Sequence, residues 1–268
     1  MEPQERIFLK FCSSSAVRDF EKLHYVRKMD SYVLHRGKNS KDVGEVRGHH
    51  GQQIHYLIWY EITPNTWRNV GVISGGSAVY AVKARDLFFG IDKSNREKVI
   101  NGIIDNTLFR IEGGKKNLAT RVLSMWRKQV ALDWRSLYDA EPYGFETFVE
   151  EADIIRADGS SGRRSGALYK ADNWTLAGAS VGNTKHHIGR GLTGGLAGRP
   201  FVREQVPPKL CFCKWIGKER LARVCEYKSS WRLETTEEKT LAALRSLCRN
   251  ELMRRDTTKA IELGILSV

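Results

Sequence analysis

The sequence predicts a mixed α/β domain in which a central sheet is flanked by helices. Residues 54–62 and 69–74 are dense in aromatic and β-branched residues and are joined by a proline–asparagine turn, a pattern typical of a β-hairpin. Residues 107–111 indicate a buried strand, and a glycine turn then leads into an amphipathic helix at 117–132. A capping box followed by leucines at helical spacing predicts a further helix over 235–252.

Helical spacing of apolar residues predicts a first helix at 16–29, and the Gly-, His- and Lys-rich segment 36–53 is expected to be a loop. Residues 78–89 fit either a strand or a short helix, and 92–105 indicates a helix. The rest of the chain predicts strands at 145–149, 175–178 and 210–216, a short helix at 168–173, and loops at 156–165 and 182–200.

The length of 268 residues and the 41% hydrophobic content favour one large domain, taken as 1–230, with a C-terminal amphipathic helical extension at 231–268. Forty-four Lys+Arg residues against 31 Asp+Glu residues give a formal net charge of +13. This field attracts polyanions, so nucleic acid is the expected partner and binding should depend on salt. A basic surface without a binding role is the alternative.

Five cysteines in a chain of this size indicate a reducing compartment. Cys211 and Cys213 have one residue between them, a spacing that fits alternation on a strand better than a zinc ligand pair. No apolar run reaches the roughly 20 residues needed to span a bilayer, and the polar start has no signal-peptide pattern. We therefore expect a cytoplasmic protein that does not contact the membrane.

The stretch 166–175 contains a phenol, an amide and an indole, and it follows in the sequence a predicted strand that ends in Glu150 and Glu151. A tyrosine such as Tyr169 can transfer a proton, and a partly buried carboxylate can act as general base. The alternative is that Tyr169 and Trp174 are core aromatic residues and the glutamates solvate the strand end.

A second candidate site is the turn from Arg110 to Asn117. Backbone N–H groups at a helix N-terminus, freed by Gly113 and Gly114 and assisted by Lys115, suit a phosphate or pyrophosphate. A tight structural connection explains the same glycines equally well.

Two basic, glycine-rich segments, residues 36–50 and 185–203, suit contact with a phosphate backbone. A tryptophan could also stack on an extruded base. Adjacent histidines in these segments lack the spacing of a zinc site, so we expect no metal. The residues expected to bind nucleic acid are His24, Tyr25, Arg47, Trp174, Lys185 and Arg190.

The order of several motifs, above all Phe145-Glu-Thr-Phe-Val-Glu150 and Gly166-x-x-Tyr-Lys-Ala-x-Asn173-Trp, resembles the Mom DNA-modification proteins of phages. It is also similar to the DruA-type proteins of Druantia anti-phage systems. The resemblance covers roughly residues 20–220. It implies a fold like that of the GNAT acyltransferases, a mixed central sheet flanked by helices, here with long basic loops and a C-terminal helix.

Resemblance to Mom implies a transferase that converts the exocyclic amine of adenine in double-stranded DNA to a carbamoylmethyl (acetamido) form, which shields phage DNA from host restriction. The donor would be acetyl-coenzyme A or another acyl or aminoacyl carrier, and the location would be the host cytoplasm. By the same resemblance the catalytic residues would be Arg110, Glu150, Tyr169 and Asn173, and the donor would lie at Arg110, Gly113, Gly114, Lys115 and Asn117.

Two departures from that pattern leave alternatives open. The relatives carry Asp where this chain has Glu150, so either Glu150 or Glu151 takes that role, and Lys115 stands where the donor turn usually has a small residue. The first alternative function is a non-catalytic nucleic-acid-binding component of a DruA-like defence system. The second is an acyltransferase acting on another hypermodified base or on RNA.

Overall fold

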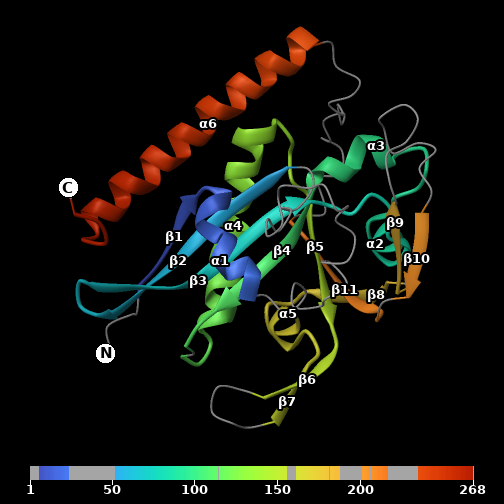
Figure 1. The fold of residues 1–268 in the computed structure, drawn as a ribbon, viewed down its shortest axis with the longest axis horizontal. Coiled ribbons are helices and arrows are strands. Elements are labelled where there is room, and N and C mark those ends of the chain that lie inside the picture. The colour runs from blue at the N-terminus through green and yellow to red at the C-terminus, as the bar shows by residue number, and fades with distance from the viewer. Residues whose placement is uncertain are drawn as a thin grey trace, which may run out of the picture.

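The computed structural model describes residues 6–23, 52–113, 115–155, 161–180, 182–187, 201–205, 207–216 and 235–267. It confirms the predicted mixed α/β fold: a seven-stranded sheet of order β1-β2-β3-β4-β5-β11-β8 is flanked by helices (Figure 1). Two small hairpins, β6–β7 and β9–β10, lie outside this sheet.

The strands of the main sheet are β1 Ile7–Cys12, β2 Gln53–Thr63, β3 Thr66–Ser77, β4 Ile103–Ile111, β5 Gly144–Glu150, β8 Thr175–Ala179 and β11 Lys209–Trp215. The hairpins comprise β6 Ala152–Ile155, β7 Ser161–Arg164, β9 Asn183–His187 and β10 Phe201–Gln205. The helices are α1 Ser14–Leu23, α2 Lys83–Phe89, α3 Arg96–Val99, α4 Leu118–Tyr138, α5 Ala167–Ala171 and α6 Thr235–Glu262, with a 3-10 turn at Ile100–Gly102.

The main sheet is antiparallel except where β4 pairs with β5. That parallel ladder is short and runs only from Ile103↔Gly144 to Asp105↔Glu146. Just beyond it, the β3–β4 register shifts: Gly76 pairs with Asp105 but Ser74 pairs with Leu108, so β4 holds one extra residue. Such a bulge bends the strand and strengthens its local twist. The bend explains why β4 leaves β5 at this point.

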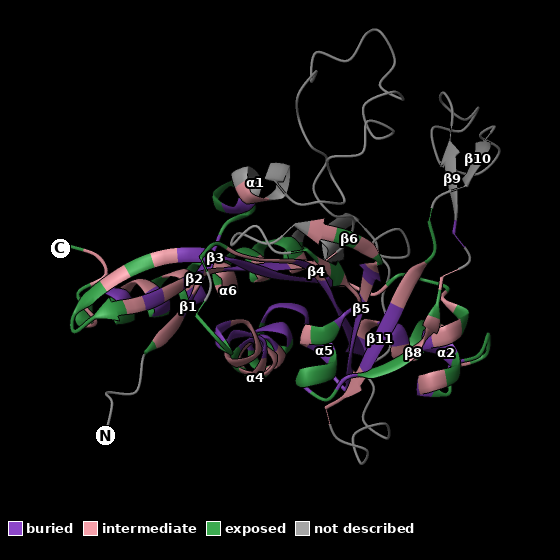
Figure 2. Cartoon of the chain, turned by 90° about the horizontal axis from the view of Figure 1, so that it is seen from below, coloured by how far each residue is buried: buried purple, intermediate pink, exposed green. Residues whose placement is uncertain are grey.

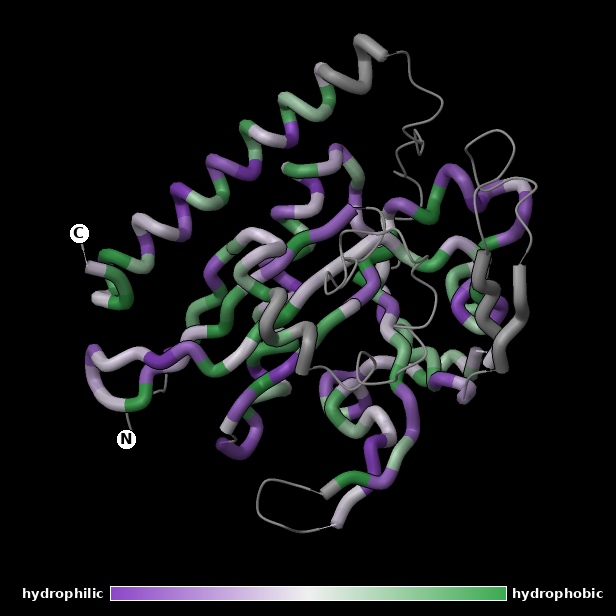
Figure 3. Tube along the Cα trace, in the orientation of Figure 1, coloured by the Kyte–Doolittle hydropathy of each residue, from purple (hydrophilic) through white to green (hydrophobic). Residues whose placement is uncertain are grey.

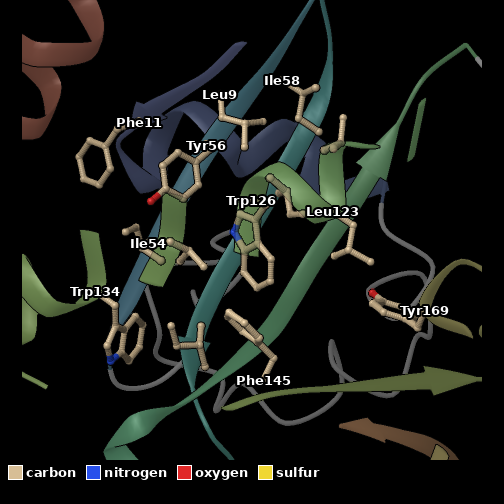
Figure 4. Packing of buried hydrophobic residues seen from close by; sticks show 14 of the residues in the cluster. Leu9, Phe11, Ile54, Tyr56, Ile58, Leu123, Trp126, Trp134, Phe145 and Tyr169 are labelled. Carbon is tan, nitrogen blue, oxygen red and sulfur yellow. The ribbon is translucent and has the colours of Figure 1, made fainter. Parts of the chain in front are cut away.

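The main hydrophobic core lies between α4 and one face of the sheet (Figure 4). Trp126, Val130 and Trp134 of α4 are fully buried, at a spacing that puts them on one side of the helix. They meet Ile54 and Tyr56 of β2 in the same cluster. The opposite face is covered in part by α1, whose Val17 is also fully buried (Figure 2).

Helix α6 packs against β1 and α4 and belongs to the same core through Leu252. Its carboxylate at Asp256 accepts a hydrogen bond from the backbone N–H of Phe11 at 2.6 Å. Hydrophobic positions recur at intervals along a mostly hydrophilic α6, whereas the central strands are richer in them (Figure 3). The contact places the C-terminal helix beside the N-terminal strand.

Several local predictions are corrected by the structure. Strand β1 was not expected, and the helix predicted for 92–105 is confined to α3 and the 3-10 turn, because its apolar end forms β4. The loops predicted at 156–165 and 182–200 contain the strands β7 and β9. The ambiguous segment 78–89 contains the helix α2. Within the described residues, no helix is both long and apolar enough to cross a membrane.

Candidate functional site

The candidate site is built around the point where β4 and β5 part, which we call the divergence. The two strands start side by side and then separate toward their carboxyl ends, with α5 lying between them (Figure 1). Because parallel strands end at the same edge of a sheet, their separation opens the sheet at this edge. Both sequence motifs flank this opening, one on β5 and one on α5.

Side chains fill the divergence on the α4 face. Thr147 Oγ1 donates a hydrogen bond to the backbone oxygen of Asn106 at 3.1 Å, where the backbone ladder has stopped. The Tyr169 hydroxyl donates to Asn106 Oδ1 at 2.7 Å and lies 3.4 Å from Thr147 Oγ1. Tyr169 is only 8% exposed. Its phenol therefore holds the divergence in place on this face.

The rest of the tyrosine motif is also directed inward. Trp174 is 4% exposed and its indole lies 5.1 Å from the Tyr169 ring. Its Nε1 donates to Asp172 at 2.8 Å, and the same carboxylate receives Arg127 at 2.6 Å and 2.8 Å. Lys214 donates to the backbone oxygen of Asp172 at 2.7 Å. The alternative expectation, that these aromatics belong to the core, matches this geometry, and Trp174 offers no exposed face for a base.

The residues expected to be catalytic do not meet. Side chains alternate along a strand, and Thr147 and Val149 face α4 and α5, so Glu150 projects from the other face of β5. Glu150 pairs in register with Lys209, away from Tyr169. Asn173 is exposed in a left-handed conformation, with φ of 58°. The structure therefore separates Glu150 and Asn173 from the buried Tyr169.

The expected donor turn does lie at the end of β4. Arg110 Nε contacts Glu112 at 3.0 Å, Gly113 has a positive φ of 76°, and Asn117 precedes α4 with φ of 65°. The side chain of Asn117, the N-cap residue, makes no capping hydrogen bond to α4. Lys115 lies 5.3 Å from the centre of the Tyr60 ring. Lys115 and Asn117 are exposed, so the turn presents positive charge to solvent at the N-terminus of α4.

A buried ionic cluster, which the sequence did not predict, lies on the sheet face opposite α4. It is located where β4 and β5 begin to part. Glu146 and Arg85 are both fully buried, and Arg85 Nη1 donates to Glu146 at 2.7 Å. Arg85 Nε also donates to Asp86 at 2.6 Å, and Arg96 donates to the same carboxylate at 2.6 Å. The glutamate of the Phe-Glu-Thr-Phe motif is thus a structural anchor that ties β5 to α2.

This cluster makes stability depend on pH. Burial raises the pKa of Glu146 from 4.5 to about 7, against the opposing effect of Arg85. An acid that binds its proton more tightly in the folded state stabilises the fold below its unfolded pKa, and that contribution is lost as pH rises through the folded pKa. We expect the free energy of unfolding to fall between about pH 4.5 and 7 by on the order of 3 kcal/mol.

Urea denaturation at several pH values measures this decline. The Glu146→Gln variant, whose amide does not titrate, should show a smaller decline over the same range. An equal decline in both proteins would assign the pH dependence to other groups.

Several predicted nucleic-acid contacts and one donor residue lie outside the described residues: His24, Tyr25, Arg47, Arg190 and Gly114. Lys185 lies on β9, opposite Arg203 of β10, and its side chain is not described. No cluster of metal-ligating side chains occurs among the described residues.

The family model of the Druantia protein DruA matches residues 19–221, about three quarters of the chain. The chain belongs to the DruA family. It is therefore related to components of Druantia anti-phage systems. Comparisons with curated proteins and with solved structures give no match.

The DruA match spans both motifs and every strand of the divergence. It begins after β1 and ends before α6, the two elements that pack against each other. The family match thus contains the candidate site, and β1 and α6 lie outside it.

Proposed function

We propose that this chain is the nucleic-acid-binding component of a Druantia-type anti-phage system and that it binds through the open end of the divergence. The observation that carries the proposal is the basic surface there. Exposed or half-exposed cations come from the donor turn, the start of α4, β7 and α5: Lys115, Lys116, Arg121, Arg163, Arg164 and Lys170. Two nearby acids are already paired, Glu112 with Arg110 and Glu151 with Arg163.

This arrangement suits a phosphate backbone because cations on separate elements flank one opening. The net charge of +13 adds a long-range attraction. The inward direction of Tyr169 and Trp174 favours binding over base chemistry at those residues. Double-stranded DNA is the partner we propose.

A second candidate function is group transfer of the Mom type, with an acyl donor such as acetyl-coenzyme A. The observation in its favour is that parallel strands diverge beside a glycine turn that leads into the N-terminus of α4, an arrangement suited to a pyrophosphate. Its product would be modified adenine, and a GNAT-like ancestry would explain the fold.

Two measurements separate the candidates. A transferase should show a thermal shift with coenzyme A, since a ligand that binds the native state raises its stability. It should also leave modified nucleosides, detected by mass spectrometry, in plasmid from cells expressing the chain. A binding component should give neither signal while binding DNA in a salt-dependent manner.

The double variant Lys116→Glu/Lys170→Glu tests the proposed surface. Both lysines are exposed, one in the donor turn and one on α5. If each contacts a phosphate, we expect weaker binding to all sequences and a salt slope reduced by about 2. Fluorescence anisotropy at several salt concentrations measures both quantities.

The matched control is Lys93→Glu/Lys98→Glu, which makes the same change of charge on exposed residues next to and within α3. It should retain most of the affinity. Equal losses in the two double variants would show that net charge, and not this surface, determines binding.

A further inference from the structure

The sheet face opposite α4, which α1 covers only in part, carries accessible aromatic side chains. Leu9 of β1 and Ile58 of β2 belong to the α4 core. Because side chains alternate along a strand, their neighbours Phe8 and Trp59 project from the opposite face. These two residues are partners in register, and both are half-buried, so each ring keeps accessible surface. The hairpin end of β2 and β3 extends beyond α1 (Figure 2).

Residues in register across β1 to β4 form three rows on this face. The first row is Lys10–Leu57–Val72–Arg110, the second is Phe8–Trp59–Asn69, and the third joins Glu61 to Trp67 beside Arg6. Leu57, Trp59 and Glu61 are two residues apart on β2, so the three rows share one face. Cations therefore lie at both ends of the first row, and aromatic rings lie in the second and third.

Trp67 shows that a flat group can reach an aromatic ring of this face. The guanidinium of Arg6, an exposed residue, lies 5.2 Å from the centre of the Trp67 ring. A cation of this kind sits over the face of the ring, which is also where a base would stack. The indole N–H groups of Trp59 and Trp67 have no hydrogen-bond partner among the described residues, so no internal hydrogen bond explains either tryptophan.

The charge of this face suits an anionic chain. Lys10, Arg6 and Arg110 outnumber Glu61, the one carboxylate in the three rows. Arg6 Nε binds that carboxylate at 2.5 Å. The side chain of Arg110 is 33% exposed and contacts Glu112 at 3.0 Å. The face therefore combines positive charge with accessible rings.

We propose that the three rows bind a segment of single-stranded DNA, with bases stacked on Phe8 and Trp59 and phosphates held by Lys10 and Arg110. Antiparallel sheets with aromatic side chains on neighbouring strands bind single strands in this way, because every base has a π face. A duplex keeps its bases paired and stacked inside, so these rings do not serve it. The inference rests on the proposed nucleic-acid binding and adds a second site, which adjoins the donor turn at Arg110.

Two labelled oligomers of equal length test the inference: oligo-dT, and an abasic strand that keeps the phosphates and lacks the bases. Fluorescence anisotropy with the full chain measures both affinities. Base stacking predicts that the wild type binds oligo-dT at least about fivefold more tightly than the abasic strand. Only contacts to bases produce this ratio, because both strands carry the same charge.

Substitutions of Trp59 assign the ratio to this face. Trp59→Phe keeps a ring and should keep the preference for oligo-dT. Trp59→Leu keeps apolar packing and loses the flat ring, so the ratio should fall several-fold while the affinity for the abasic strand is unchanged. The matched control is Tyr80→Leu, which removes an exposed ring that lies 5.5 Å from the Arg96 guanidinium, outside the three rows. This control should keep the full preference.

Lysine substitutions separate this site from the divergence. Lys10→Gln removes a phosphate contact, so it should weaken oligo-dT and the abasic strand alike and leave their ratio unchanged. Lys116→Glu/Lys170→Glu should weaken binding of a duplex and also leave this ratio unchanged.

Equal affinity of the wild type for the two strands, or a full preference that survives in a folded Trp59→Leu variant, would overturn the inference and leave duplex binding at the divergence intact. If Trp59→Leu does not fold, Phe8→Leu takes its place, because Phe8 lies in the same row. If neither a duplex nor a single strand binds in a salt-dependent way, the proposed function itself fails.

Discussion

Replacing Arg85 by leucine should lower the free energy of unfolding by about 3–5 kcal/mol, the cost of leaving a buried charge without its partner. Arg85 is fully buried and donates to Glu146, to Asp86 and to the backbone oxygen of Val79. Its removal leaves two carboxylates near each other, and the leucine satisfies neither. Urea denaturation of the purified variant measures the loss.

The control for this prediction is Arg96→Leu. Arg96 binds Asp86 from the edge of the cluster, with a side chain that is 16% exposed, and Asp86 keeps its bond to Arg85. We expect a loss of about 1 kcal/mol or less for this partly exposed pair. A loss in Arg85→Leu as small as that of Arg96→Leu would contradict the role of Arg85 as anchor.

Replacing Trp174 by alanine should also cost about 3–5 kcal/mol, because it empties a large volume in the core. The indole lies 5.9 Å from the Phe145 ring and 5.1 Å from the Tyr169 ring, and its N–H binds Asp172. Thermal and urea denaturation measure this loss. The site's affinity for DNA should be unchanged wherever the variant is folded.

Trp174→Phe separates packing from base stacking. Phenylalanine keeps most of the buried ring and loses only the bond to Asp172, which Arg127 still binds, so we expect a loss of about 1 kcal/mol. If Trp174 stacked on a base, alanine would weaken DNA binding by roughly 1–3 kcal/mol per base. Such a loss of affinity in a folded variant would contradict the structural role.

The parts of the fold that the sequence predicted best are those where local pattern and tertiary contacts agree. The β2–β3 hairpin alternates regularly around its turn, and helix α4 presents one apolar face to the sheet. Strand β1 was missed, because its pairing with β2 and its contact with α6 come from residues far away in the sequence. The helix predicted over 92–105 failed because the apolar residues at its end form β4, buried in the sheet.

The sequence predicted which segments surround the divergence and did not predict which face each side chain takes. The two motifs do flank the divergence, and the donor turn does end β4. Which face each side chain takes depends on strand register, and the bulge in β4 shifts that alternation. From the sequence we grouped Glu150 with Tyr169, although Glu150 projects from the face of β5 opposite the one that packs against Tyr169 of α5. Alternation along the predicted strand at 145–149 was the available signal.

Arg85 could not be identified from the sequence, because an arginine in a short helix is ordinary there. Its importance comes from burial and from partners on other elements. Glu146 lay inside a recognised motif, yet its role as an anchor follows from α2, whose helical state was itself ambiguous.

The central claim is that nucleic acid binds at the open end of the divergence, and hydrogen–deuterium exchange with and without a DNA duplex tests it most directly. Exchange reports local protection of backbone amides. The claim predicts slower exchange in the donor turn at 112–117, in α5 and in the β6–β7 hairpin, with α6 unchanged. Protection confined to α6 and the β1–β2 pair, with none at the divergence, would contradict it.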